Sequence, residues 1–218
     1  MDIDFWLERW ASKQIGFHQE RGNPRLERFW PTLEPGSGGR VFVPLCGKSR
    51  DMIWFLEQGY RVVGCELSSL AVEAFFAESG LTPAIQQAAR YTRWKNNGME
   101  ILCGDFFSLE PADIGAIDTF YDRASLVALT PAQRTLYAGH LADLVSKDAS
   151  GLLITLDYNQ AELSGPPFAV SAAEVDRLFG DSFDIRPVFS YDVLEENPGF
   201  REKGLTELFE QAYVLKRR

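Results

Sequence analysis

Gly47 and Glu66 are the first residues whose types and spacing could do chemistry. Gly47 lies in a short turn after an apolar run, where a glycine lets a ligand approach the backbone and a helix N-terminus. Glu66 ends a second apolar run about 20 residues further on, where a carboxylate accepts hydrogen bonds from ribose hydroxyls. The pair predicts half of a nucleoside-binding site. The structural alternative is a turn glycine and a strand-end glutamate without a ligand.

The elements that must position this pair form one strand–helix–strand unit. Residues 40–44 are apolar with β-branched and aromatic side chains, which predicts a buried strand. Apolar residues at helical spacing over Met52–Leu56 predict a helix, which Gly59 ends. A second strand follows over Tyr60–Cys65. Such a unit requires parallel strands and a right-handed crossover.

Two phosphate-binding motifs compete with this interpretation. A P-loop needs a further glycine five residues before Gly47, and that position is Phe42, so the P-loop is rejected. A nicotinamide dinucleotide site needs three glycines in the turn, which here reads PLCGKS. A nucleoside without phosphates fits better, and S-adenosylmethionine is the common cofactor of that kind.

The charge balance argues against a nucleic-acid partner. Acidic residues outnumber basic ones by 31 to 22, and the net charge is −9. A nucleic-acid-binding protein needs a basic face for the phosphate backbone. The length of 218 residues and a hydrophobic share of 45% suit one α/β domain over residues 1–218.

The cysteine and histidine content predicts neither disulfides nor a metal site. The three cysteines, Cys46, Cys65 and Cys103, are widely spaced, and only two histidines are present. The acidic, aromatic N-terminus resembles no signal peptide, and no membrane span is predicted. We therefore expect a cytoplasmic protein without membrane association.

The remaining pattern predicts an α/β fold with a Rossmann-like, seven-stranded, mostly parallel sheet and helices on both faces. A polar stretch over residues 81–97 is expected to be a loop with a short helix. Two strand-like runs without a helix between them close the chain, and they favour an antiparallel hairpin at one edge of the sheet. Five further strands are predicted from apolar runs, at 40–44, 60–65, 99–103, 117–121 and 151–156, before the two final runs at 185–194 and 205–215.

The N-terminal segment is predicted to cover the site. An aromatic stripe over Asp4–Gln14 favours an amphipathic helix outside the sheet. Such a stripe either packs on the domain or forms a lid over a planar ligand through its two tryptophans. Residues 1–38 are accordingly expected to be a helical cover of the active site.

Five sequence motifs, in order and at consistent spacing, make the chain resemble the thiopurine S-methyltransferase family over nearly its whole length. The motifs are GFHQ (16–19), VPLCGKS (43–49), VVGCELS (62–68), YDRASLVAL (121–129) and GPPF (165–168). The resemblance implies transfer of a methyl group from S-adenosylmethionine to a small-molecule thiol such as a thiopurine, and in bacterial relatives also to selenium or tellurium compounds. It leaves the physiological acceptor open.

The resemblance also implies roles for individual residues. The expected cofactor contacts are Trp10, Leu45, Glu66, Asp105, Phe106 and Arg123. Phe17 and Arg201 are expected at the acceptor, and Asp105 and Phe106 are expected to hold the adenine.

Methyl transfer needs the nucleophile, the methyl carbon and the leaving sulfur to be collinear more than it needs acids and bases. Arg123 is therefore the one catalytic candidate, because its guanidinium favours an anionic acceptor and can touch the cofactor carboxylate. A salt bridge to Asp122 or another acid is its structural alternative, and His18 is the only other candidate base.

Two other classes of function stay open on the sequence. A nicotinamide-dependent oxidoreductase shares the Rossmann-like fold, and a non-catalytic module could bind a nucleoside as a sensor. The absence of heptads or an apolar exposed helix in the pattern predicts a monomer.

Overall fold

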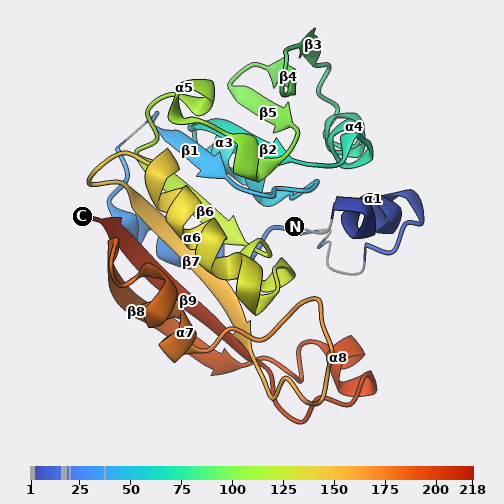
Figure 1. The fold of residues 1–218 in the computed structure, drawn as a ribbon, viewed down its shortest axis with the longest axis vertical. Coiled ribbons are helices and arrows are strands. Elements are labelled where there is room, and N and C mark those ends of the chain that lie inside the picture. Colours follow the sequence, from blue (N-terminus) through green and yellow to red (C-terminus); the bar gives the residue numbers. More distant parts are fainter. Residues whose placement is uncertain (1–2, 16–18, 20, 37) are drawn as a thin grey trace.

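A mixed β-sheet runs through the molecule in the order β3-β4-β5-β2-β1-β6-β7-β9-β8 (Figure 1). The computed structural model describes residues 3–15, 19, 21–36 and 38–218. Within these residues the strands are β1 Arg40–Val43, β2 Arg61–Glu66, β3 Ala84–Gln87, β4 Thr92–Asn96, β5 Met99–Cys103, β6 Thr119–Arg123, β7 Ser150–Asp157, β8 Phe183–Asp192 and β9 Phe209–Arg217.

The centre of the sheet is parallel, as the sequence predicts. Strand β1 pairs in parallel with β2 and β6, β2 pairs with β5, and β6 pairs with β7. Strand β9 lies antiparallel between β7 and β8, so the last two strands form the predicted antiparallel hairpin. The carboxyl ends of the parallel strands therefore meet at one edge, where ligands of open α/β sheets bind.

The described sheet has nine strands, so the prediction of seven was wrong. Residues 81–97, predicted as a loop with a short helix, contain β3 and β4, which pair antiparallel with each other and extend the sheet beyond β5. Every residue of β3 is exposed. Because its side chains face water, β3 lacks the apolar alternation by which a half-buried strand is recognised.

Short helices connect these strands. Their bounds are α1 Ile3–Ala11, α2 Pro24–Phe29, α3 Asp51–Glu57, α4 Ser69–Glu78, α5 Pro111–Ile114, α6 Pro131–Leu144, α7 Ala172–Phe179 and α8 Pro198–Glu202, with single turns of 3₁₀-helix at η1 Trp30–Leu33, η2 Phe106–Ser108 and η3 Leu126–Ala128.

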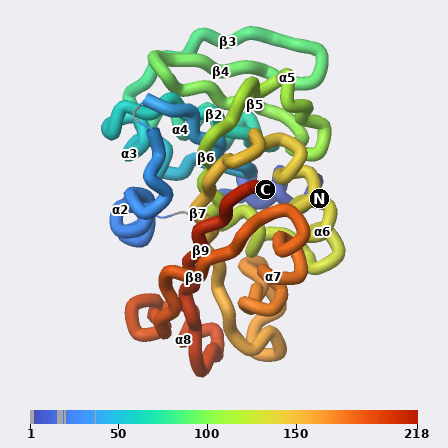
Figure 2. The backbone as a smooth tube through the Cα atoms, turned by 90° about the vertical axis from the view of Figure 1, so that its left-hand side faces the viewer, coloured from blue at the N-terminus to red at the C-terminus, as the bar shows by residue number. Residues whose placement is uncertain are grey.

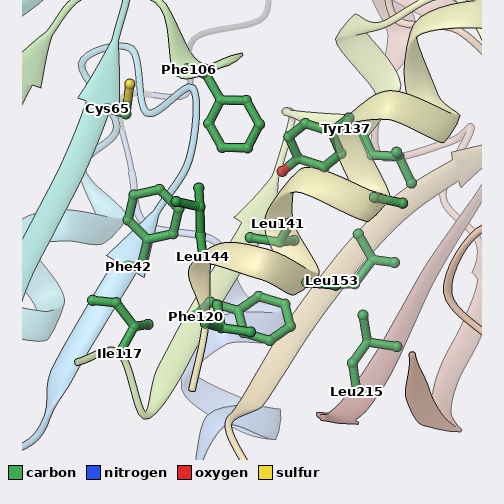
Figure 3. Packing of buried hydrophobic residues seen from close by; sticks show 14 of the residues in the cluster. Phe42, Cys65, Phe106, Ile117, Phe120, Tyr137, Leu141, Leu144, Leu153 and Leu215 are labelled. Atoms are coloured by element: carbon green, nitrogen blue, oxygen red, sulfur yellow. The ribbon is translucent and has the colours of Figure 1, made fainter. Parts of the chain in front are cut away.

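The helices cover both faces of the sheet, and each face has its own hydrophobic core. Helices α2 and α3 lie on one side, and α6 and α7 lie on the other (Figure 2). Neighbouring strand residues alternate between the cores: Phe120 and Leu153 pack toward α6, whereas Tyr121 and Leu152 pack toward α3. Phe42, Phe106 and Tyr137 meet in the core below α6 (Figure 3).

Side-chain caps fix where the two helices on the α6 face begin. Thr130 and Gln133 form a reciprocal capping box at the start of α6. At α7 the Ser171 hydroxyl accepts a hydrogen bond from the Glu174 backbone N–H at 3.3 Å, while the Glu174 carboxylate pairs with Arg134 at 2.8 Å. These local signals made both helix starts predictable.

Two helices lie beyond the carboxyl ends of the strands. Helix α1 contacts α4 beside the sheet, and α8 lies at the far end of the molecule near the β7–β9 pair (Figure 1). The predicted helix over Asp4–Gln14 is confirmed as α1, although it ends earlier, at Ala11. Among the described residues, none of the helices has the length and apolar content that a membrane crossing requires.

Candidate active site

The turn between β1 and α3 has two residues with left-handed backbone angles, and only one of them is a glycine. Leu45 and Gly47 both have positive φ angles, of 43° and 52°. The Cys46 backbone N–H donates to the Cys65 carbonyl at 2.9 Å, which ties the turn to β2. A Cβ on Gly47 would lie 3.3 Å from Cζ2 of Trp10, so a glycine here also admits the indole of α1.

Glu66 ends β2 and connects two turns. Its Oε2 accepts a hydrogen bond from the Gly47 N–H, and its Oε1 accepts one from the Ser68 N–H, both at 2.8 Å. Only 7% of the residue is exposed. Burial raises the pKa of the Glu66 carboxyl, although the backbone N–H donors act in the opposite direction. A carboxylate oxygen can accept more than one hydrogen bond, so Glu66 retains capacity for a ligand.

Arg123 ends β6 and pairs with a carboxylate that the sequence analysis did not single out. Its Nη1 lies 3.0 Å from Oδ2 of Asp51, which is 1% exposed. The Tyr121 hydroxyl donates to the same oxygen at 3.0 Å. Burial lowers the pKa of Arg123, but Tyr121 and Asp51 outweigh this effect and the pKa is raised overall. Arg123 is therefore a permanent cation held in one place.

Asp122, the other acid considered for Arg123, points into the core. It accepts a hydrogen bond from the Tyr137 hydroxyl at 2.6 Å and one from the Leu126 N–H at 3.3 Å. Adjacent strand residues face opposite sides of a sheet, which separates Asp122 from Arg123. Arg123 therefore forms its ion pair with Asp51 and not with Asp122. A salt bridge to an acid other than Asp122 was part of the structural alternative given for Arg123.

A cavity of about 620 Å³ joins these groups. One end is lined by Trp6, Trp10, Leu45, Gly47 and Glu66. The other end has an apolar surface formed by Ile154, Leu156, Pro166, Pro167, Val193, Phe200 and Leu208, with the polar side chains of Asn23, Arg25, Glu196, Asn197, Lys203 and Glu210 also in the lining. Arg123 also lies in the lining of this cavity. A largely apolar pocket with a few placed polar groups is the usual form of a small-molecule site.

Four of the predicted cofactor residues line this cavity, namely Trp10, Leu45, Glu66 and Arg123. They come from α1, the first turn, β2 and β6, so the fold brings together residues that are far apart in the chain. Their contacts with a cofactor stay predictions.

Three other predicted residues that the structure describes, Asp105, Phe106 and Arg201, are not in the lining of the cavity. Asp105 caps η2 by accepting from the Phe107 N–H at 3.1 Å, and Phe106 is 0% exposed and stacks on Phe42 in the core (Figure 3). Arg201 is half exposed on α8 and pairs with Glu195. Phe17 and His18 lie outside the described residues. The roles proposed for all of these residues stay predictions.

Sequence reasoning missed several polar residues in and around the cavity, among them Asn23, Arg25, Asp51 and Glu210. Asn23-Pro24 reads as an ordinary helix start, and an acid such as Asp51 in the first helical turn reads as a response to the helix dipole. Only Glu210 carried a signal, because it is an isolated charge in the apolar run of the last strand.

Among the residues that the structure describes, no group of three or more histidines, cysteines or acids is arranged to hold a metal ion. The residues do fit an adenosyl group. A buried carboxylate with spare acceptor capacity faces the cavity beside a turn that exposes backbone, and indole rings stand across from it.

Comparison with known proteins shows the family to which the chain belongs. The family model described as thiopurine S-methyltransferase (TPMT) matches residues 1–218. A thiopurine S-methyltransferase of Nitrosospira multiformis is 51% identical over 218 residues, which are 100% of this chain and 99% of that protein. One of Azotobacter vinelandii is 46% identical over 218 residues, covering 100% of both chains.

Solved structures share the fold at low sequence identity. A methyltransferase of Burkholderia thailandensis, solved with 1,6-didemethyltoxoflavin and S-adenosylhomocysteine, superposes with a TM-score of 0.66 at 16% identity, over 99% of this chain and 86% of that one. An S-adenosylmethionine-dependent methyltransferase of Methanosarcina mazei gives a TM-score of 0.63 at 14% identity, over 89% of this chain and 97% of that one.

The fold and the site together define an S-adenosylmethionine-dependent methyltransferase. Its sheet carries one strand pair, β3–β4, beyond the seven strands predicted. Within this class, the chain belongs to the thiopurine S-methyltransferase family.

Proposed function

We propose that this enzyme methylates the sulfur of aromatic and heterocyclic thiols such as thiopurines. One observation carries the proposal: a single cavity joins the Glu66 turn to an apolar chamber, with Arg123 in its lining. A flat apolar thiol fits such a chamber, and a cation beside it favours the thiolate form. The names of the relatives from Nitrosospira multiformis and Azotobacter vinelandii support the same acceptor class.

The end of the cavity near the first turn is proposed to hold the cofactor. S-adenosylmethionine, when bound, supplies a methyl group on a sulfonium sulfur. Glu66 would accept from ribose hydroxyls, Leu45 and Gly47 would offer the backbone of the turn, and Trp10 would cover this end. Asp105 lies at the carboxyl end of β5, directly beside β2, and is proposed to reach the adenine amine.

Arg123 is proposed to act on the acceptor by charge rather than by moving a proton. Its guanidinium is held in place by the ion pair with Asp51, so an approaching thiolate meets a charged hydrogen-bond donor already held in position. Fixed donors need no reorganisation as the reaction proceeds. Alignment of the nucleophile with the methyl group then accounts for most of the rate acceleration.

The proposal also includes the role of the N-terminal segment and the compartment in which the enzyme works. Residues 1–38 act as the cover of the site, since Trp6, Arg9 and Trp10 of α1 line the cavity. The three cysteines are free, Cys46 and Cys65 being buried, which suits a monomeric enzyme working in the reducing cytoplasm.

Selenium and tellurium compounds are proposed as further acceptors. Displacement at a methyl group favours soft, polarisable nucleophiles, and cations such as Arg123 and Arg25 in the cavity lining suit an anionic acceptor. Such methylation would serve in metalloid detoxification.

A methyl-transfer screen tests the proposed function. The protein is incubated with methyl-labelled S-adenosylmethionine and thiophenol, mercaptopurine, selenite or tellurite, and labelled product is counted. We expect transfer to the aromatic thiols and its loss in Arg123→Ala. The control is Arg61→Ala, an exposed arginine at the opposite end of β2. No transfer to any thiol, or tighter binding of a nicotinamide dinucleotide than of adenosylhomocysteine, would overturn the proposal.

A further inference from the structure

A second buried ion pair lies in the lining of the cavity, apart from that of Arg123 and Asp51. Arg25 of α2 and Glu210 of β9 both line the cavity, and their side chains are each 14% exposed. The Arg25 Nε atom donates to Oε2 of Glu210 at 2.7 Å. Glu210 is opposite Leu156 in the β7–β9 register, so the pair stands beside the apolar end of the cavity.

Asn23 connects the two ion pairs. Its backbone N–H donates to Oδ1 of Asp51 at 2.7 Å, and its Nδ2 donates to Oε1 of Glu210 at 3.3 Å. Its own Oδ1 accepts from the Arg25 N–H at 2.8 Å. Arg25, Glu210, Asp51 and Arg123 are thus fixed relative to one another, and a third carboxylate, that of Glu196, lies 3.7 Å from Arg25. This arrangement gives Arg25 and Arg123 a defined separation along the wall of the cavity.

The Arg25 guanidinium also lies over an aromatic ring. Its guanidinium carbon lies 4.4 Å from the centroid of the Phe189 ring. One N–H, on Nε, is used by Glu210, and Nη2 lies 3.7 Å from Oε2 of the exposed Glu196, which leaves donors of the two Nη atoms for a ligand. A planar donor group next to a carboxylate presents donors and an acceptor side by side, the pattern that a heterocycle with ring nitrogens and a ring N–H can match.

We propose that Arg25 and Glu210 select the acceptor by reading the polar edge of a heteroaromatic thiol, an inference that rests on the proposed function. The guanidinium donates to a ring nitrogen, and the carboxylate accepts from a ring N–H. The ring itself packs on Ile154, Leu156 and Leu208, and its sulfur is directed toward Arg123. The class of ligand is a planar nitrogen heterocycle with an exocyclic sulfur, in preference to a benzenoid thiol.

The competing explanation is that the pair only fastens α2 to β9. Loss of such a fastening would lower the methylation of every acceptor alike and would lower the melting temperature. Recognition of a polar edge would instead change the ratio between two acceptors, one with ring nitrogens and one without. The readout is therefore kcat/KM for mercaptopurine divided by kcat/KM for thiophenol, measured in each variant.

Three variants make the experiment decisive. Arg25→Met removes the donors and keeps an unbranched side chain, and Glu210→Gln keeps the shape but replaces an acceptor by a donor. Arg28→Met is the matched control, because Arg28 lies on the same helix, is exposed and stacks on Phe29 5.0 Å from the ring centroid, outside the cavity.

We expect the ratio to fall about tenfold to a hundredfold in Arg25→Met and in Glu210→Gln, and less than additively when both are changed, while Arg28→Met keeps the wild-type ratio. Hydrogen bonds to charged groups are the source of that range. Methylation of both thiols with an unchanged ratio in Arg25→Met, or an equal fall in Arg28→Met, would overturn the inference and leave the proposed function standing. Wild-type protein that methylates neither thiol would overturn both.

Discussion

Glu66 has a structural task in addition to the cofactor-binding task proposed for it. It accepts backbone hydrogen bonds from both turns that flank the cofactor end of the cavity. The same group faces the cavity from the end of β2. Removing it should therefore loosen the first turn as well as remove an acceptor for the ribose.

Glu66→Ala should weaken the binding of adenosylhomocysteine by about tenfold to a hundredfold, because a hydrogen bond to a charged group contributes about 1.5–3 kcal/mol. Isothermal titration calorimetry gives the affinity. Glu66→Gln keeps one acceptor oxygen and is the matched variant, for which we expect a smaller loss. Wild-type affinity in Glu66→Ala would remove Glu66 from the site.

Arg123→Ala should reduce turnover more than it reduces cofactor affinity. The guanidinium is proposed to favour the acceptor anion, so its loss lowers the fraction of the acceptor that is present as the reactive thiolate. The substitution also leaves the Asp51 carboxylate buried without its partner, at a cost of about 3–5 kcal/mol in folding free energy. Thermal unfolding must accompany the kinetics for that reason.

Arg123→Lys separates charge from shape, because lysine restores the cation but not the planar guanidinium. We expect it to recover part of the turnover and most of the stability. Equal losses of turnover and cofactor affinity in Arg123→Ala would show that the arginine is only an anchor for the cofactor.

At the scale of elements, the contact between β6 and α6 contains a buried acid that should make stability depend on pH. Burial raises the pKa of Asp122 to about 6, and its hydrogen bonds from Tyr137 and Leu126 only partly counter this. In the unfolded chain the same group has an ordinary pKa of about 4. The folded state therefore binds the proton more tightly, and this contribution to stability is lost as pH rises from about 4 to about 6.

Asp122→Asn should flatten that part of the pH profile. Its free energy of unfolding, measured by urea denaturation at several pH values, should lack the downward slope that we expect of the wild-type protein between pH about 4 and about 6. An identical slope in both proteins would mean that other groups cause the pH dependence.

Which elements the sequence predicts depends on whether their signal is local. The capping box of Thr130 and Gln133 lies within a few residues, and the core strands are continuous apolar runs, so both were predictable. Strand β3 was not, because it is held at the edge of the sheet by backbone pairing with β4 while its side chains are exposed.

The candidate site divides in the same way. Gly47 and Glu66 belong to one strand–helix–strand unit and were predicted from their spacing, whereas Leu45 was implied by the resemblance to the family. Glu210 reaches the cavity only because β9 enters the sheet between β7 and β8, and Arg25 only because α2 packs on Phe189 of β8. Such meetings of distant segments follow from the whole fold and leave no short pattern in the sequence.

At the scale of the whole molecule, the cavity depends on parts of the chain from both ends. Helix α1 gives two tryptophans to its lining, and the C-terminal strand gives Glu210. The central sheet between them supplies Glu66 and Arg123 at the carboxyl ends of β2 and β6, the two parallel strands on either side of β1. The account thus rests on one claim about shape: the cofactor lies between Trp10 and Glu66, and the acceptor chamber opens beyond Arg123.

A crystal structure of the protein with adenosylhomocysteine tests this claim most directly. The account predicts the ribose hydroxyls within hydrogen-bonding distance of Glu66, the homocysteine sulfur directed toward the chamber lined by Leu156 and Leu208, and the Arg25–Glu210 pair facing that chamber. Adenosylhomocysteine bound elsewhere on the protein, or a first turn and α1 closed on each other with no room for it, would contradict the account.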